Sequence, residues 1–174
     1  MRAELRELEK YRTPLSEHEV GFTLDICDQI VQSHWSATHR RFEGGNAGDS
    51  GYNEALSDEN FRTAYQVQYV WQMGLWRMQA LFEGILSQWF PDLDDLSFTK
   101  KVRSLGDVGV VLPSGLRSEL HQWIDLRNSL SHDPPEAPTF SHQLERQDLE
   151  DFMTIVGEVL SIARAHRKPL PPEV

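Results

Sequence analysis

An arginine and a histidine lie close together near the end of a segment with helical periodicity, and their side chains suit phosphate chemistry. Arg127 is followed by Asn128, and four residues separate Arg127 from His132. A guanidinium group offers a planar set of donors that fits phosphate oxygens, and it stays charged. A histidine titrates near neutral pH, so it can accept or donate a proton. Such a pair could bind a phosphate group and transfer a proton near neutral pH.

The segment that carries these residues is predicted to form a helix over about 115–132, with Ser114 as its N-cap and Pro134-Pro135 forcing its end. On a helical wheel, Arg127 falls within the arc of the apolar side chains of this segment, which are Leu120, Trp123, Ile124, Leu126 and Leu130. A guanidinium cannot be buried among apolar groups without a partner. We therefore expect either that a carboxylate or phosphate meets its charge, or that this face lines a hydrated cleft.

The run Leu126-Arg-Asn-Ser-Leu-Ser-His132 resembles the signature of the HEPN superfamily (higher eukaryotes and prokaryotes nucleotide-binding domain). That signature is an Arg, usually followed by Asn, His or Asp, with four to six residues between the Arg and a His. It lies on a helix near the end of an all-α domain. Arg12 and His18 match the loose spacing, but Thr13 follows this Arg and Pro14 breaks any helix there.

The resemblance implies a dimerising helical domain in which two signatures face each other across one composite site. Many members are metal-independent endoribonucleases, often toxins or antiviral effectors, whose expected products are a 2′,3′-cyclic phosphate and a 5′-hydroxyl. By this resemblance Arg127 and His132 are catalytic, and Asn128 orients His132 or the phosphate. Ser131 is a candidate substrate-binding residue. The sequence has one short cluster of cations that comes close to a basic patch: Lys100, Lys101 and Arg103. This cluster could attract RNA to a cleft, or it could be an ordinary solvated face.

One position departs from the family pattern. Some members carry a Tyr shortly after the motif His, which a nucleotidyltransferase antitoxin modifies, but Asp133, Pro134 and Pro135 occupy that stretch here. Asp133 could instead orient His132 or be a solvated loop acid. The alternative function is a non-catalytic HEPN-like module that binds a nucleotide, an RNA or a nucleotidyltransferase partner. A further alternative is a helical scaffold in which Arg127 has only a structural role.

The whole chain is predicted to be one HEPN-like domain over 1–174, an all-α bundle of four or five main helices. A capping-box pattern, Ser16-x-x-Glu19, opens a helix that runs to about Phe42. Further helices are expected over 58–89, over 97–105 with Gly106 as the stop, and over 145–166. The expected irregular segments are an N-terminal appendage (1–15), a Gly-rich mobile loop (43–58) and a loose tail (169–174).

The broad apolar face of the segment 58–89 predicts contact on more than one side, either at the centre of a bundle or at a dimer seam. Its aromatic row extends from Phe61 to Trp89. The resemblance to HEPN proteins implies a homodimer, in which this row would serve as core and dimer seam rather than as a platform for stacking bases.

The composition of the chain restricts how it could bind RNA and which metal or disulfide sites it could have. The chain has 27 acidic and 17 basic residues, a net charge of −10, so any RNA binding must come from a local patch rather than from the overall field. Cys27 is the only cysteine, which excludes an intrachain disulfide and a Cys-based zinc cage. We expect no metal site, no cofactor, no membrane association and a cytoplasmic location.

Overall fold

The computed structural model describes residues 15–132 and 143–167, and its regular structure is entirely helical within those ranges. The elements are α2 (Glu17–Arg41), α3 (Ser50–Trp89), α4 (Phe98–Arg103), α5 (Ser114–His132) and α6 (Arg146–Arg164), with the 3₁₀ turns η1 (Pro91–Leu93) and η2 (Ser104–Val108). The predicted all-α bundle is confirmed. The tail and all of the N-terminal appendage except Leu15 lie outside the described residues.

The first described helix begins where its sequence predicts. The Ser16 backbone N–H donates to Glu19 Oε2 at 2.8 Å, and both halves of the capping box are present. These bonds satisfy donors that the first turn of a helix otherwise leaves unpaired. At the other end His39, Arg40 and Arg41 occupy the last turn, where the helix dipole favours cations.

The glycine-rich segment is shorter than the predicted loop over 43–58, because α3 already begins at Ser50. The cause is Asp49, whose carboxylate accepts hydrogen bonds from the backbone N–H groups of Gly51 (2.9 Å) and Tyr52 (3.5 Å). An aspartate N-cap of this kind is enough to start a helix despite a nearby glycine. The Tyr52 hydroxyl also donates to the Phe42 carbonyl at 2.8 Å, which ties the two ends of the turn together.

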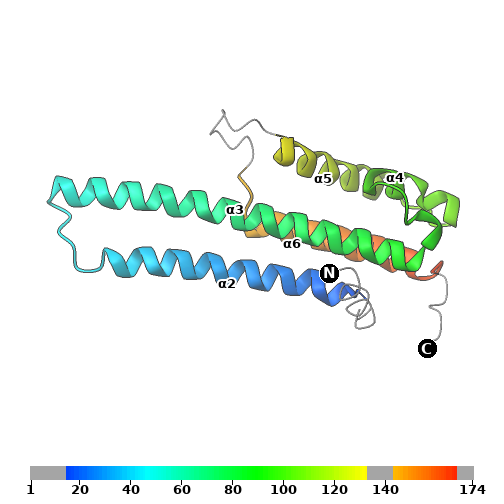
Figure 1. Cartoon of the computed structure of the whole chain (residues 1–174), viewed down its shortest axis with the longest axis horizontal. Helices are drawn as coiled ribbons and strands as arrows, with labels where there is room; N and C mark the ends of the chain where they lie inside the picture. The colour runs from blue at the N-terminus through cyan, green and yellow to red at the C-terminus, as the bar shows by residue number, and fades with distance from the viewer. Residues whose placement is uncertain (1–14, 133–142, 168–174) are drawn as a thin grey trace, which may run out of the picture.

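Helices α2 and α3 form a long antiparallel hairpin whose tip extends beyond the rest of the bundle (Figure 1). With 40 residues, α3 is about 60 Å long at 1.5 Å per residue. Helix α6 covers the hairpin only near its base. The side-chain amide of Gln68 fixes the start of that contact: it donates to the Leu144 carbonyl (2.9 Å) and accepts from the Leu144 N–H (2.8 Å).

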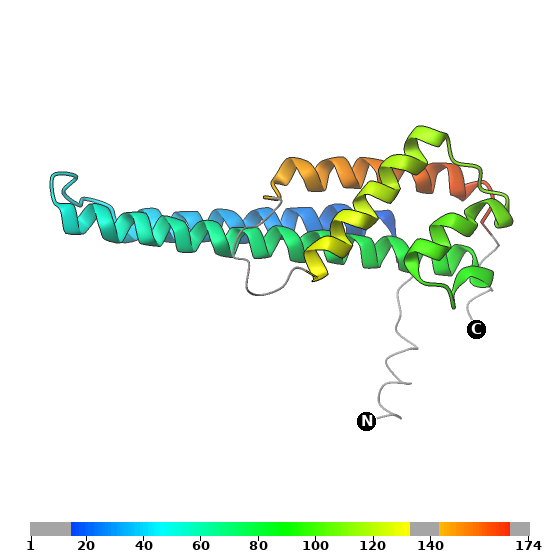
Figure 2. The same cartoon turned by 90° about the horizontal axis from the view of Figure 1, so that it is seen from above.

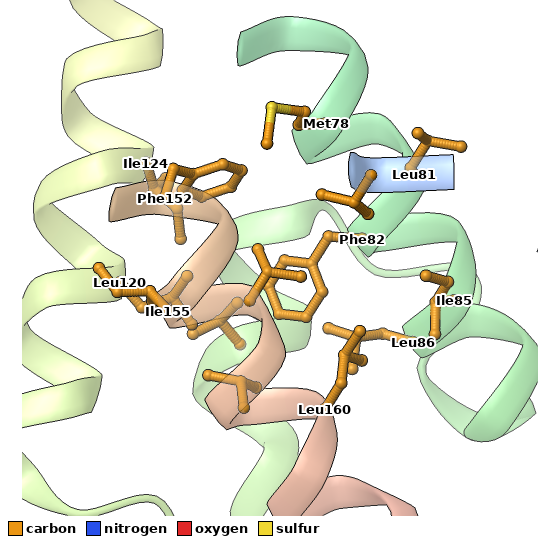
Figure 3. Close-up of a cluster of buried hydrophobic side chains, with 14 of the residues drawn as sticks. Met78, Leu81, Phe82, Ile85, Leu86, Leu120, Ile124, Phe152, Ile155 and Leu160 are labelled. Carbon is orange, nitrogen blue, oxygen red and sulfur yellow. The ribbon is translucent and has the colours of Figure 1, made fainter. Parts of the chain in front are cut away.

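The core lies at the base of the hairpin, where α3, α5 and α6 meet. Figure 3 shows Phe82 of α3 between side chains of α3 and α6, with Ile124 of α5 beside Phe152 of α6. Trp123 also packs on Phe152, with ring centroids 5.4 Å apart. The largest fully buried side chains include Leu75, Met78, Phe82, Ile85, Leu120, Ile124 and Phe152.

The connection between α3 and α5 is compact and helical, and its stop differs from the predicted one. Gly106 lies inside η2, and the chain leaves the helical conformation at Gly109, whose φ is +88°. A positive φ is easily reached only by glycine. Leu105 within η2 and Val110 directly after Gly109 are both buried in the core.

Cys27 is buried between α2 and α3, and its Sγ donates to the Val70 carbonyl at 3.7 Å. Burial raises the pKa of this thiol, because a thiolate loses solvation in an apolar environment. It is therefore a packing residue. No helix in the described part of the chain has the length and apolar character to cross a membrane.

The close approach of α2 and α6 to Gly74 of α3 predicts that an added methyl group at this position is destabilising. A Cβ there would lie 2.7 Å from Cys27 Sγ and 2.8 Å from Leu149 Cδ2. Gly74→Ala should therefore lower the free energy of unfolding by about 1–2 kcal/mol, even though alanine is the better helix former. Urea denaturation measures this change.

Gly157→Ala is the matched control for that substitution. Gly157 is an exposed position within α6, and nothing lies within 4 Å of an added Cβ. The control should raise the free energy of unfolding by about 0.5–1 kcal/mol. A Gly74→Ala protein as stable as Gly157→Ala would contradict the close contact of α2, α3 and α6.

Candidate functional site

Helix α5 is held to the bundle by one row of apolar side chains and presents the Arg-Asn pair beside that row. Leu116, Leu120 and Ile124 are buried at intervals of four residues, as expected for one face of a helix. Arg127 follows Ile124 by three residues and is exposed, while Asn128 is half-buried. The helical position thus agrees with the predicted arc, but Arg127 lies at its outer edge and is not sealed in the core.

Residues at this edge of α5 line a cleft of about 340 Å³. Three elements line it: α3, the start of α4 and α5. The lining residues are Trp76, Gln79, Ala80, Glu83, Ser97, Phe98, Thr99, Ile124, Arg127 and Asn128. Its volume lies at the small end of the range for ligand sites, and the edge of α5 that carries Arg127 and Asn128 borders it.

Arg127 and Asn128 are bonded to each other within this cleft. Arg127 Nη1 donates to Asn128 Oδ1 at 3.3 Å. The bond uses the amide oxygen of Asn128 and one of the five guanidinium N–H groups. Asn128 therefore helps to set the direction of the guanidinium.

Helix α3 contributes three side chains with polar atoms to the lining of the cleft. Gln79 Nε2 donates to the Trp123 carbonyl at 3.1 Å and so couples α3 to α5. Trp76 Nε1 is a buried donor without a hydrogen-bond acceptor among the described residues, which is a costly state for an indole N–H. Glu83 brings a carboxylate, half-exposed, to the same cleft as Arg127.

The sequence does not single out Trp76, Gln79 or Glu83. Within 58–89 the tryptophan matches an apolar face, and Gln79 and Glu83 match the ordinary polar positions of an amphipathic helix. Only the crossing of α5 over α3 shows that these side chains share a cleft with Arg127. An isolated sequence pattern carries no information on that crossing.

The three cations of the predicted basic patch do not share one surface. Lys100 and Arg103 are exposed, but Lys101 is only 3% exposed. Its Nζ donates to the Asp94 carbonyl at 2.7 Å and lies 3.3 Å from Glu83 Oε1. The expectation that Lys101 contributes to a substrate-binding surface is therefore corrected: its charge is used inside the fold, where it links η1, α3 and α4.

Ser131 and His132 are the last two residues of α5, and their side chains lie outside the described residues, as do Asp133, Pro134 and Pro135. In helical register, position 132 is one turn beyond Asn128, and position 131 is one turn beyond Arg127. The Arg-Asn-His run thus occupies the final turns of α5, next to the cleft.

No group of three His, Cys, Asp or Glu side chains within 15–130 and 143–167 has a geometry that could hold a metal ion. Comparison of the chain with protein-family models, with curated proteins and with solved structures finds no match. The site must therefore be interpreted from its own residues.

Lys101 provides a test of the internal role just described. Lys101→Ala should lower the free energy of unfolding by about 2–4 kcal/mol, because it leaves the Asp94 carbonyl and Glu83 without their buried donor. Lys100→Ala, one residue away and exposed, should change it by less than about 0.5 kcal/mol. Equal urea denaturation curves for the two variants would show that Lys101 has no such role.

Proposed function

We propose that the protein is a metal-independent endoribonuclease of the HEPN type that acts in the cytoplasm as a homodimer, with a toxin or defence role. The observation that carries this proposal is the position of Arg127: it is exposed at a cleft, bonded to Asn128, in the last turns of a helix that ends at His132. The all-helical fold is compatible with it. A structural arginine would instead be sealed by a carboxylate within the core.

The proposed reaction is an internal transesterification of RNA. The 2′-oxygen attacks the adjacent phosphorus while a His132 imidazole takes its proton, and the bond from phosphorus to the 5′-oxygen breaks. A protonated His132 from the second copy gives a proton to that leaving oxygen. The products are a 2′,3′-cyclic phosphate and a 5′-hydroxyl, and no water or metal ion enters this step.

Arg127 would bind the nonbridging phosphate oxygens, whose negative charge grows in the transition state. Asn128 would position Arg127 through the bond of its Oδ1, and its amide N–H₂ group would be directed to the phosphate or to His132. Ser131 would contribute a hydroxyl, and Lys100 and Arg103 are the exposed cations of α4 that would attract the strand. Each role follows from the donors that the side chain offers.

A non-catalytic HEPN-like binding module is the second candidate. The carboxylate of Glu83 lines the same cleft as Arg127, and the net charge is −10. Both features weaken the attraction for a polyanion. Such a module would bind a nucleotide or a protein partner, such as a nucleotidyltransferase antitoxin, and would leave RNA intact.

RNA cleavage in excess EDTA tests the catalytic proposal. The purified wild type should cleave a labelled RNA, and the new 3′ ends should carry a 2′,3′-cyclic phosphate. Arg127→Ala and His132→Ala should each reduce the cleavage rate by at least about 100-fold, as expected for the loss of charge stabilisation or of acid–base catalysis.

Helix α5 supplies matched controls for both substitutions. On the same helix, Arg117 is exposed and lies ten residues before Arg127, and His121 is half-exposed and lies eleven residues before His132. Arg117→Ala and His121→Ala should cleave at the wild-type rate. Absence of cleavage by the wild type, with retained binding of a nucleotide or RNA, would favour the binding module, and equal rates in all four variants would refute the assigned site.

A further inference from the structure

A second feature of the molecule lies on the hairpin, away from the Arg127 cleft. Seven large apolar side chains are exposed in two rows, each with a spacing of four residues that places its members on one helical face. Phe22 (64% exposed), Phe61 (75%) and Met73 (59%) are the most exposed of them. We call this set the apolar stripe: Phe22, Ile26 and Ile30 of α2 with Phe61, Tyr65, Tyr69 and Met73 of α3.

Five of the seven side chains, all except Phe61 and Tyr65, line a groove between α2 and α3. The groove has a volume of about 700 Å³, and all of its lining residues belong to these two helices. Gly74 lies in it and Cys27 is buried beside it. Because α6 contributes nothing to the lining, the groove belongs to a part of the hairpin surface that the bundle leaves uncovered.

The stripe is too large to be an ordinary feature of a monomer. With roughly 200 Å² for each large apolar side chain, its exposed fractions amount to about 700 Å². The largest apolar patch on a typical monomer covers about 300–600 Å². One side of a standard protein interface covers about 800 Å². The stripe thus has the size of one half of an interface.

The charges in the groove favour a second copy of the same surface over other occupants. Glu19 and Arg77 are the only ionised residues that line the groove, so the groove itself carries no net charge. A nucleic acid strand needs cations along its path, and a membrane-bound helix needs a basic border. Neither is present among the residues that line this groove.

The shape of the hairpin also suits self-association. Helices α2 and α3 are antiparallel (Figure 2). A two-fold rotation can therefore place the stripe of one copy against the stripe of the other, so that α2 and α3 of both copies form one apolar interface of four helices.

We propose that the apolar stripe binds the same stripe of a second copy and forms a two-fold dimer with a four-helix interface. This interface does not depend on RNA cleavage. Where both proposals hold, it also lies near the catalytic site, because adjacent residues of α3 line the two features: Arg77 lines the groove, and Trp76 lines the Arg127 cleft.

Sedimentation equilibrium of the full chain tests the interface. The wild type should be dimeric at micromolar concentration. Ile26→Glu and Met73→Glu should each weaken the dimer at least 100-fold, because each places a carboxylate in the apolar seam. Val111→Glu is the matched control, since Val111 is 72% exposed but lies outside the stripe, and it should remain dimeric.

The salt response gives a second, independent test. The two copies each carry a net charge of −10, so screening should reduce their repulsion and strengthen an apolar dimer between 50 and 500 mM NaCl. A wild type that is monomeric at 100 µM, or stripe variants that dimerise as well as Val111→Glu, would refute the proposal. Circular dichroism confirms that each variant is folded.

RNA cleavage separates this proposal from the function proposed above. A dimeric wild type that does not cleave RNA would contradict the ribonuclease and support the stripe. Monomeric stripe variants that cleave RNA at the wild-type rate would also support the stripe as the interface, and they would contradict the composite site.

Discussion

The burial of the second half of α3 is the interaction on which the rest of the structure depends. From Trp71 to Trp89 this helix contributes a larger share of the core than any other described element, and α2, α4, α5 and α6 pack around it. Burial of large apolar side chains contributes about 1.5–3 kcal/mol each, so this segment dominates the stability of the bundle. The Arg127 cleft and the groove beside the apolar stripe are both lined by residues of this helix, which lie on different faces of it.

The position of Arg127 illustrates how a helix can use a charged residue at the edge of its buried face. Leu116, Leu120 and Ile124 hold α5 in the bundle, and the helix emerges from the core in its last turns. A cation near the C-terminal end of a helix is favoured by the exposed carbonyl groups there. The same position places Arg127 in the lining of a cleft between α3, α4 and α5.

The sequence predicts the helical architecture well, because its signals are local. The capping box at Ser16, the four-residue periodicity of α6 and the breaks near Pro91 and Pro113 each depend on residues a few positions apart. The errors arise where two local signals compete. At Asp49 an N-cap outweighs a run of glycines, and beyond Gly106 the 3₁₀ turn η2 continues to Val108, so the chain leaves the helical conformation only at Gly109.

The site is predicted less completely, because it depends on contacts between helices. The motif residues stand out by spacing alone, whereas the cleft needs the crossing of α5 over α3. Lys101 shows the same limit: three cations close together in sequence resemble a surface patch, yet the middle one is bonded to Asp94 and Glu83 inside the fold. Only the register of the short helix α4 decides which of the three faces inward.

The part of the hairpin that extends beyond α6 has a consequence for cooperativity. No residue from Ser50 to Arg62 is buried, and the packing near the tip consists mainly of the Thr38–Thr63 hydroxyl bond of 2.6 Å and the Phe42–Tyr52 contact. Helix α3 is continuous along its backbone, but its two halves have very different local stability. Amide protons near the tip would exchange through frequent partial opening, while those from Trp71 onward would exchange only when the whole bundle unfolds.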